Sequence, residues 1–157
     1  MAKIVDLNHK WAIAIGRVFV AFGGIEYTLF KCLENIPSDN ILQSTKNLPL
    51  GKRVDLLQEI LTIHENLEAV ELKRNLRKIK TLSESRNLIA HNPLVLDLYS
   101  SGNDDVFFKE KIMSLKKPDK HMYFDELEKL AVDSEELSSN FLKSALSVFR
   151  RLDGNNA

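Results

Sequence analysis

An arginine and a histidine five residues apart are the side chains with the clearest chemical use in this sequence. Arg86 is followed directly by Asn87, and His91 stands just before Asn92-Pro93. Histidine exchanges protons near neutral pH, and the planar guanidinium of arginine binds two oxygens of one phosphate. Cleavage of RNA by its own 2′-hydroxyl needs a base, an acid for the leaving 5′-oxygen and positive charge around the crowded phosphate. We therefore expect Arg86, Asn87 and His91 to form a catalytic set for phosphodiester cleavage.

Two further residues, Glu84 and Glu26, are candidates to support this set. Asn87 and Glu84 precede His91 by four and seven positions, so both lie close to its helical face and either could orient the imidazole, with Asn87 favoured. Glu26 stands on a mostly apolar helical stripe, where a charged group needs a partner. The alternative interpretation of the motif is structural: a histidine at a helix end and an Arg86 paired with a carboxylate, for which Glu26 is the candidate.

The angular spacing of the motif indicates a dimer. At about 100° per residue, His91 lies roughly 140° around the helix from Arg86. One subunit therefore presents the two side chains on neighbouring faces. A two-fold cleft would bring two histidines and two arginines around one phosphate, so we expect a homodimer.

At these residues the chain resembles the HEPN superfamily (higher eukaryotes and prokaryotes nucleotide-binding domains). The family motif is Arg, four to six residues, then His, often with a polar residue directly after the Arg, and Arg86, Asn87 and His91 match it. The resemblance implies an all-helical bundle and a metal-independent endoribonuclease that acts as a dimer in the cytoplasm. It also implies a bacterial toxin or phage-defence effector, with a cognate antitoxin or regulatory protein as a partner. Pro93 stands where some toxin members carry a tyrosine that an antitoxin modifies.

Basic residues near the motif would suit an RNA backbone. The stretch 71–86 holds six basic and two acidic residues, and 109–121 holds five basic and two acidic. Lys73, Arg77 and Lys80 are the candidate RNA contacts on the motif's own helix. A solvated helix face is the alternative explanation of these charges.

Apolar periodicity predicts the elements that must position the motif. Seven residues with alternating steps of four and three predict a helix over about 8–35: Trp11, Ile15, Val18, Phe22, Ile25, Leu29 and Cys32. Similar patterns predict helices over about 50–64, 66–91 and 125–152, with one short helical turn between Pro37 and Pro49. The β-rich runs 94–99 and 106–112 flank Ser-Gly-Asn-Asp-Asp and predict a hairpin. We expect an all-α, antiparallel four-helix bundle in a single domain, residues 1–157, with a short hairpin insertion between the third and fourth helices and a frayed tail at 154–157.

Gly23-Gly24 interrupts the first predicted helix. Each glycine costs about 0.8–1 kcal/mol in a helix relative to alanine. The pair indicates either close approach of another backbone or a kink.

Composition narrows the class of protein. Six Gly and four Pro in 157 residues favour long helices, and 44% apolar with 28% charged residues disfavours disorder. No run of 18 uncharged apolar residues is present, the net charge is zero and the only cysteine is Cys32, so we expect a cytoplasmic protein that does not enter a membrane. His9, His64 and His121 lack metal-ligand spacing, so we expect neither metal nor cofactor.

Three interpretations of function stay open at this point. The first is the metal-independent endoribonuclease. The second is a non-catalytic, dimeric helical module that binds a protein or a nucleotide. The third is a subunit whose activity depends on another protein.

Overall fold

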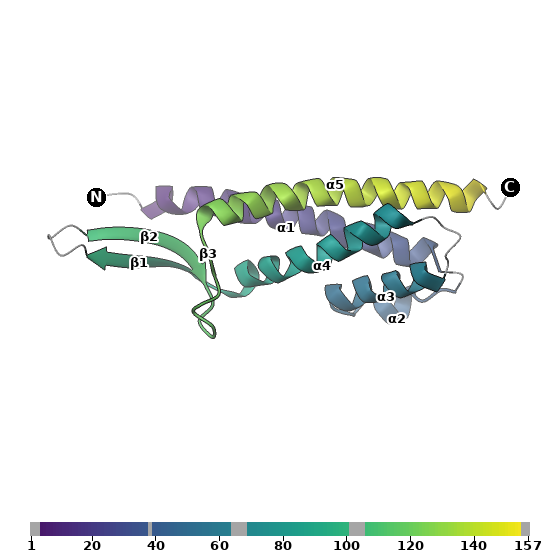
Figure 1. Ribbon diagram of the computed structural model, residues 1–157, viewed down its shortest axis with the longest axis horizontal. Helices are drawn as coiled ribbons and strands as arrows, with labels where there is room; N and C mark the ends of the chain where they lie inside the picture. The colour runs from purple at the N-terminus through teal and green to yellow at the C-terminus, as the bar shows by residue number, and fades with distance from the viewer. Residues whose placement is uncertain (1–3, 38, 64–68, 101–105, 155–157) are drawn as a thin grey trace.

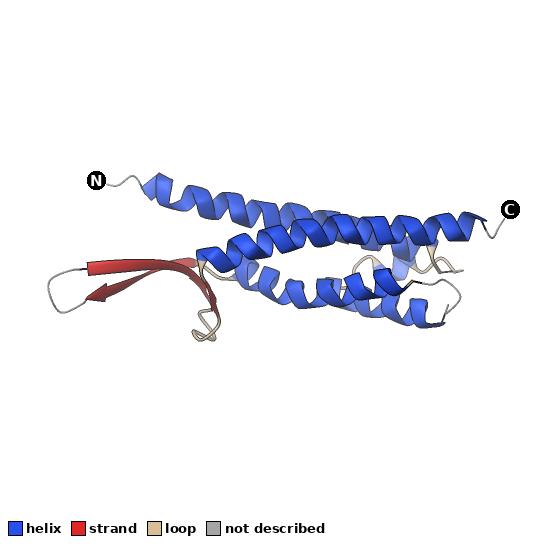
Figure 2. Cartoon of the chain, turned by 45° about the horizontal axis from the view of Figure 1, so that its top comes forward, coloured by secondary structure: helices blue, strands red, loops and turns tan. Residues whose placement is uncertain are grey.

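The computed structural model describes residues 4–37, 39–63, 69–100 and 106–154, and this part of the chain forms five helices and three strands. The elements in order are α1 (Ile4–Asn35), α2 (Leu42–Thr45), α3 (Leu50–Ile63), α4 (Val70–His91), β1 (Leu94–Ser100), β2 (Val106–Met113), β3 (His121–Met122) and α5 (Phe124–Gly154). The helices lie side by side, and β1 and β2 project from one end of them (Figures 1 and 2). The four predicted longer helices, the short helical turn and both strand runs are confirmed to within a helical turn. The expected helix ends at 64 and 66, the hairpin turn at 101–105 and the tail residues 155–157 fall outside the described residues. Gly154, expected in that tail, is instead the last residue of α5.

The expected fold class is confirmed in part, because the described chain is mostly helical but also forms a small antiparallel sheet of three strands. The strand order is β1-β2-β3, and β1 pairs with β2 in a register that runs from Leu94 opposite Ile112 to Ser100 opposite Val106. β3 adds only two pairs, one of them His121 opposite Met113. A strand of two residues carries no periodicity, so the sequence pattern gives no sign of it.

The helix directions also differ from the predicted antiparallel bundle, because α1 and α5 run parallel. The Trp11 ring meets the Phe124 ring at 5.2 Å, and Arg17 further along α1 binds Glu135 further along α5 at 2.7 Å. α4 runs the opposite way along α5 (Figure 1). The cause is the 36–49 connection, which leads the chain from the end of α1 back to its middle, where Arg53 near the start of α3 binds Glu26. The chain therefore changes direction relative to α1 only at α4.

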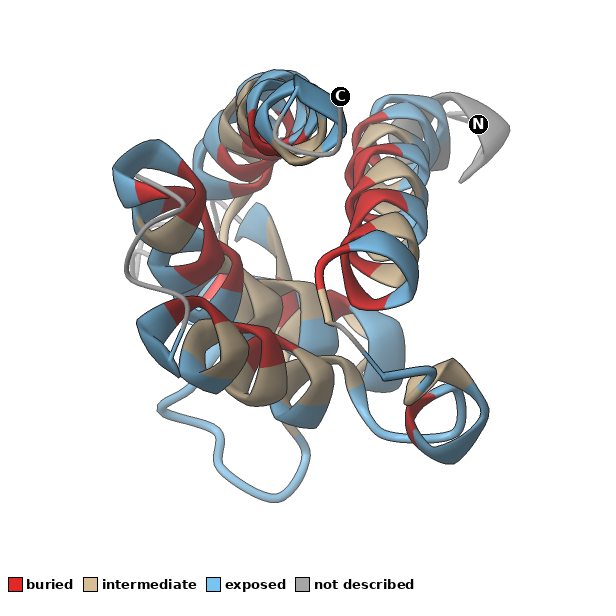
Figure 3. Cartoon of the chain, turned by 90° about the vertical axis from the view of Figure 1, so that its right-hand side faces the viewer, coloured by how far each residue is buried: buried red, intermediate tan, exposed pale blue. Residues whose placement is uncertain are grey.

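The core lies where the longer helices face one another (Figure 3). Its largest fully buried side chains include Trp11, Phe22, Leu29, Leu57, Leu76 and Phe141. At Gly24 the close neighbour is a side chain and not the backbone that the prediction named, because a Cβ there would stand 2.7 Å from Ser138 Oγ of α5. Gly23 has open space around its Cβ position, so only one glycine of the pair is explained by packing.

The start of α5 has one half of a capping box. Glu126 Oε2 accepts a hydrogen bond from the Tyr123 backbone N–H at 2.8 Å. Glu126 is the third residue after Tyr123, as the reciprocal half of a capping box requires.

α1 is the one described helix long and apolar enough to cross a membrane by length and composition. The most apolar 18-residue stretch within His9–Asn35 has a mean hydropathy of 1.5, and 39% of that stretch is buried within the protein. The core helix of a soluble protein meets the same criteria, and α1 places Trp11, Val18 and Phe22 in the core.

Candidate functional site

His91 is the last residue of α4, and the residues after it explain why the helix ends there. Asn92 has an extended backbone (φ −132°, ψ 148°), as a residue before proline prefers. Its side-chain amide donates to the Leu88 carbonyl at 2.7 Å and so satisfies one free acceptor of the last turn. His91 itself is exposed at the base of the β1–β2 hairpin. Its imidazole is therefore accessible to a ligand.

Arg86, one and a half turns earlier, turns toward α1. Its guanidinium carbon lies 5.0 Å from the centre of the Phe19 ring, and the side chain is 27% exposed. Arg86 Nη1 donates to Asn87 Oδ1 at 3.2 Å, and Nη2 lies 3.9 Å from Glu26 Oε1. The last contact is an ion pair without a hydrogen bond.

Glu26 serves a second arginine that the sequence analysis did not single out. Arg53 Nη2 of α3 donates to Glu26 Oε2 at 3.0 Å, and the Arg53 side chain is only 14% exposed. Glu26 thus connects α1 with both α3 and α4. Arg53 precedes Leu57 and Ile60 by four and seven positions, so it stands on the apolar stripe of its helix as Glu26 does on α1. Opposite charges on two inward stripes were the signal that could have found this pair.

This cluster of Glu26, Arg53 and Arg86 holds two guanidinium groups and one carboxylate. It therefore carries a net positive charge. Within the described part of the chain, the Nε atoms of both arginines are buried without a hydrogen-bond partner. A buried donor without an acceptor costs free energy, so Glu26 alone does not satisfy the donors of this cluster.

Asn87 and Glu84 are the two candidates on α4 to orient the His91 imidazole. Asn87 and Glu84 are exposed on the face that leads to His91, and the side-chain oxygen Oδ1 of Asn87 accepts a hydrogen bond from Arg86. The side-chain NH2 group of Asn87 makes no part of that bond and could orient the imidazole.

The basic candidates of α4 are not brought to the motif. Lys73 and His91 are separated by roughly 27 Å along the helix axis. Lys80 Nζ binds Asp55 Oδ1 at 2.7 Å, and Arg77 lines a hollow with Asp133 and Glu136 of α5. Carboxylates therefore accompany two of the three expected RNA contacts.

Metal ligation and thiol chemistry have little support among the described residues. In residues 4–37, 39–63, 69–100 and 106–154, no three of His, Cys, Asp and Glu come close enough to hold a metal ion. Burial raises the pKa of the Cys32 thiol to about 12, so the thiolate is disfavoured at neutral pH. The sequence matches no protein-family model, and no curated protein or solved structure is significantly similar to it.

Proposed function

We propose that this protein is a homodimeric, metal-independent endoribonuclease of HEPN type, in which α1, α3, α4 and α5 are the helices of the family bundle. The observation that carries the proposal is the net positive cluster around Arg86, five residues before an exposed His91 at the end of the same helix. Its role would be that of a cytoplasmic toxin or phage-defence effector with a cognate antitoxin or regulatory protein.

The reaction would use the 2′-hydroxyl of the RNA as the nucleophile. A base removes the hydroxyl proton, the oxygen attacks the adjacent phosphorus, and the bond to the 5′-oxygen breaks. An acid gives that oxygen a proton, so the products are a 2′,3′-cyclic phosphate and a 5′-hydroxyl. His91 acts in one of the two proton transfers and His91 of a second copy in the other, while Arg86 stabilises the phosphorane.

Arg86 is suited to this role because its carboxylate partner is shared. Glu26 accepts a hydrogen bond from Arg53, whereas its distance of 3.9 Å from Arg86 is too long for a hydrogen bond. The positive charge of Arg86 is therefore incompletely compensated, and its guanidinium can turn to a phosphate without leaving Glu26 unpaired.

An exposed apolar stripe on α1 supports the dimer. Ile13, Val20 and Tyr27 recur every seven residues and are 52%, 78% and 63% exposed. Gly16 and Gly23 lie between them on the same face with open space above, which allows a second helix to approach closely. By helical angle this stripe adjoins the side of α1 that carries Glu26 and Phe19. Two copies joined there would bring their Arg86 clusters toward one another.

Light scattering at micromolar concentration tests the dimer. We expect twice 17.9 kDa for the protein and a monomer for Val20→Lys. Val70→Lys is the matched control, because Val70 is 65% exposed at the start of α4 and away from the stripe. A monomeric parent protein, or equal effects of both lysines, would contradict the interface.

Incubation with RNA in EDTA tests the catalytic proposal. Loss of an acid–base group costs about 10²–10⁴ in rate, so His91→Ala should nearly abolish the appearance of cyclic phosphate ends. His9→Ala, which removes an exposed histidine of α1, should cleave as the parent protein does. Undiminished cleavage by His91→Ala, or cleavage that EDTA stops, would refute the mechanism.

The contact of Arg86 with Glu26 and Phe19 also favours a second candidate function. If Arg86 is a structural ion-pair partner, the protein is a non-catalytic dimeric module that binds a protein or a nucleotide. Dimers of correct mass that leave RNA intact would support that alternative.

A further inference from the structure

The β1–β2 hairpin has two faces of different composition. In an antiparallel pair, directly opposite residues share a face and successive residues alternate. The register places one set on the face we call the apolar face: Leu94, Leu96, Leu98, Phe108, Glu110 and Ile112. It places a second set on the face we call the basic face: Val95, Asp97, Tyr99, Phe107, Lys109, Lys111, Met113 and His121.

The apolar face is used by the fold at its base. Ile112 is buried, and Glu110 Oε2 accepts a hydrogen bond from Trp11 Nε1 of α1 at 2.7 Å. The basic face makes no such hydrogen bond to α1, and its residues Tyr99, Phe107 and Lys109 are exposed to a ligand.

Aromatic rings and cations alternate on the basic face. Lys109 Nζ lies 3.7 Å from the centre of the Tyr123 ring, and that ring meets the ring of His121 at 5.0 Å. Lys111 forms an ion pair with Asp97, which also accepts a hydrogen bond from the Tyr99 hydroxyl at 3.2 Å. The ion pair lowers the pKa of Asp97, so this carboxylate stays charged and holds Lys111 and Tyr99 in place.

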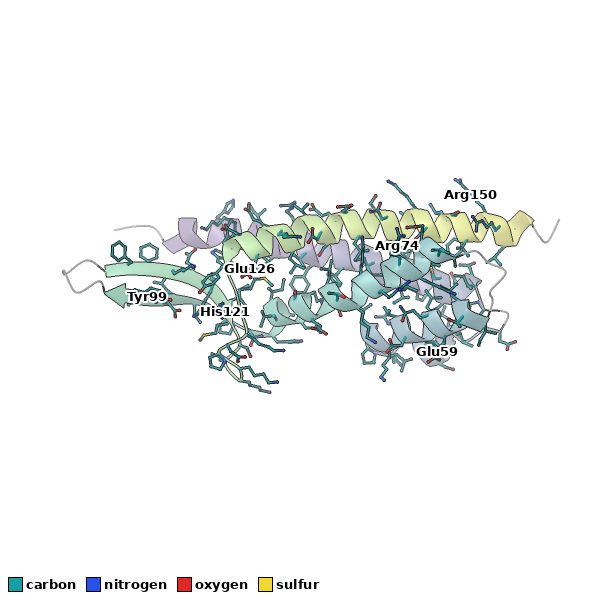
Figure 4. All side chains as sticks on the ribbon, in the orientation of Figure 1. Glu59, Arg74, Tyr99, His121, Glu126 and Arg150 are labelled. Carbon is teal, nitrogen blue, oxygen red and sulfur yellow. The ribbon has the colours of Figure 1, made fainter. Side chains whose placement is uncertain are left out.

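Two aromatic rings of this face are left in solvent. Tyr99 and Phe107 are cross-strand partners, 48% and 58% exposed. Tyr99 lies on the projecting hairpin and His121 at its base (Figure 4). Exposed planar rings at the far end of a cationic surface are typical of single-stranded nucleic acid binding, because every base has a face that can stack.

The loop that joins Met113 to His121 of this face carries further positive charge. Backbone hydrogen bonds from Ser114 N–H to the Lys120 carbonyl at 2.9 Å, and from Lys120 N–H to the Lys117 carbonyl at 2.8 Å, give the loop a defined shape. It exposes Lys116, Lys117 and Lys120. Together with Lys109 these make four exposed cations, against the exposed carboxylate of Asp119. The fifth cation, Lys111, is only 13% exposed and is paired with Asp97.

The basic face begins where the candidate catalytic residues end. β1 starts three residues after His91, and the Met113 N–H donates to the Pro93 carbonyl at 3.2 Å. Tyr99 then lies roughly 17 Å along the strand from Leu94. A strand of RNA with its phosphate at His91 can therefore continue along this face.

We propose that the basic face binds single-stranded RNA beside the cleaved phosphate, with bases stacked on Tyr99 and Phe107 and phosphates bound by the lysines. The choice of RNA as the single-stranded ligand rests on the proposed function. The aromatic rings, their exposure and the excess of lysines are independent of it.

The test is binding of a short fluorescent 2′-O-methyl oligoribonucleotide of mixed sequence, which lacks the nucleophile and is not cleaved. A stacked base contributes about 1–3 kcal/mol, so Phe107→Ala should weaken binding roughly tenfold. Phe108→Ala is the matched control: the same residue type, 57% exposed against 58%, on the opposite face. It should change binding less than about twofold. Equal losses in the two variants, or none in Phe107→Ala, would overturn the proposal.

A second measurement tests the lysines and the single-strand preference. Replacing Lys116, Lys117 and Lys120 by alanine should reduce the slope of log affinity against log salt by about 2, since each phosphate contact adds about 0.7. The duplex of the same oligonucleotide should bind more weakly, because its bases are already stacked on each other. An unchanged slope or equal duplex binding counts against the proposal. Because this probe is not cut, weaker binding by Phe107→Ala supports the basic-face proposal even if the protein has no nuclease activity. If Phe107→Ala instead binds and cleaves RNA as the parent protein does, the basic-face proposal is refuted and the proposed nuclease function is not.

Discussion

Double-mutant cycles on Glu26 measure the coupling free energy between this carboxylate and each of its two arginine partners, Arg53 and Arg86. Arg53 donates a 3.0 Å hydrogen bond to Glu26, whereas Arg86 lies 3.9 Å away without one. A hydrogen bond to a charged group contributes about 1.5–3 kcal/mol, and an exposed ion pair about 0.2–1 kcal/mol. Because Glu26 is 36% exposed and Arg53 is 14% exposed, we expect a coupling of about 1–1.5 kcal/mol between Glu26 and Arg53. The coupling between Glu26 and Arg86 should be about 0.2–0.5 kcal/mol.

Urea denaturation of Glu26→Gln, Arg53→Met, Arg86→Met and the two double variants gives both couplings. The cycle cancels the packing of each guanidinium stem, including that of Arg86 on Phe19. All proteins must be compared at one concentration, because dimerisation would make stability depend on it. A coupling to Arg86 as large as that to Arg53 would refute the reasoning. Arg86 would then be a structural ion-pair residue, and the catalytic interpretation of the motif would lose its main support.

Three further outcomes are expected. Asn75, buried on α4, donates to the Ser144 hydroxyl at 3.0 Å and to the Asn140 backbone carbonyl at 3.3 Å. Asn75→Ala should therefore lower the free energy of unfolding, measured by urea denaturation, by about 1–2 kcal/mol. An unchanged free energy would show that these bonds do not stabilise the fold. Because burial raises the pKa of Cys32 to about 12, a thiol reagent at mildly alkaline pH should modify the protein only as it unfolds, and rapid modification of the native protein would contradict the burial. In a Ser138→Ala background, Gly24→Ala should raise the free energy of unfolding, measured by urea denaturation, by up to about 1 kcal/mol. With Ser138 present the increase should be clearly smaller, because the new Cβ would stand 2.7 Å from the Ser138 hydroxyl. Equal increases in the two backgrounds would refute the clash.

Local pattern alone was sufficient to locate the helices and the two longer strands, β1 and β2. The apolar spacing of Trp11 through Cys32 and the Asn92-Pro93 break mark where α1 and α4 lie, because each depends on neighbours in the chain. Glu26 was likewise recognisable as a carboxylate that needs a partner, since a charge on an apolar stripe is costly alone.

Tertiary structure decided everything that depends on residues far apart in sequence. The parallel run of α1 and α5 follows from the path of the 36–49 connection, and periodicity does not encode that path. Arg53 entered the cluster because α3 packs beside α1, 27 positions from Glu26. The two faces of the hairpin differ only once the register sets Tyr99 opposite Phe107 and Lys109 opposite Asp97. A shift of one residue would exchange the faces, which is why composition alone could count the lysines of 109–121 without placing them on a surface.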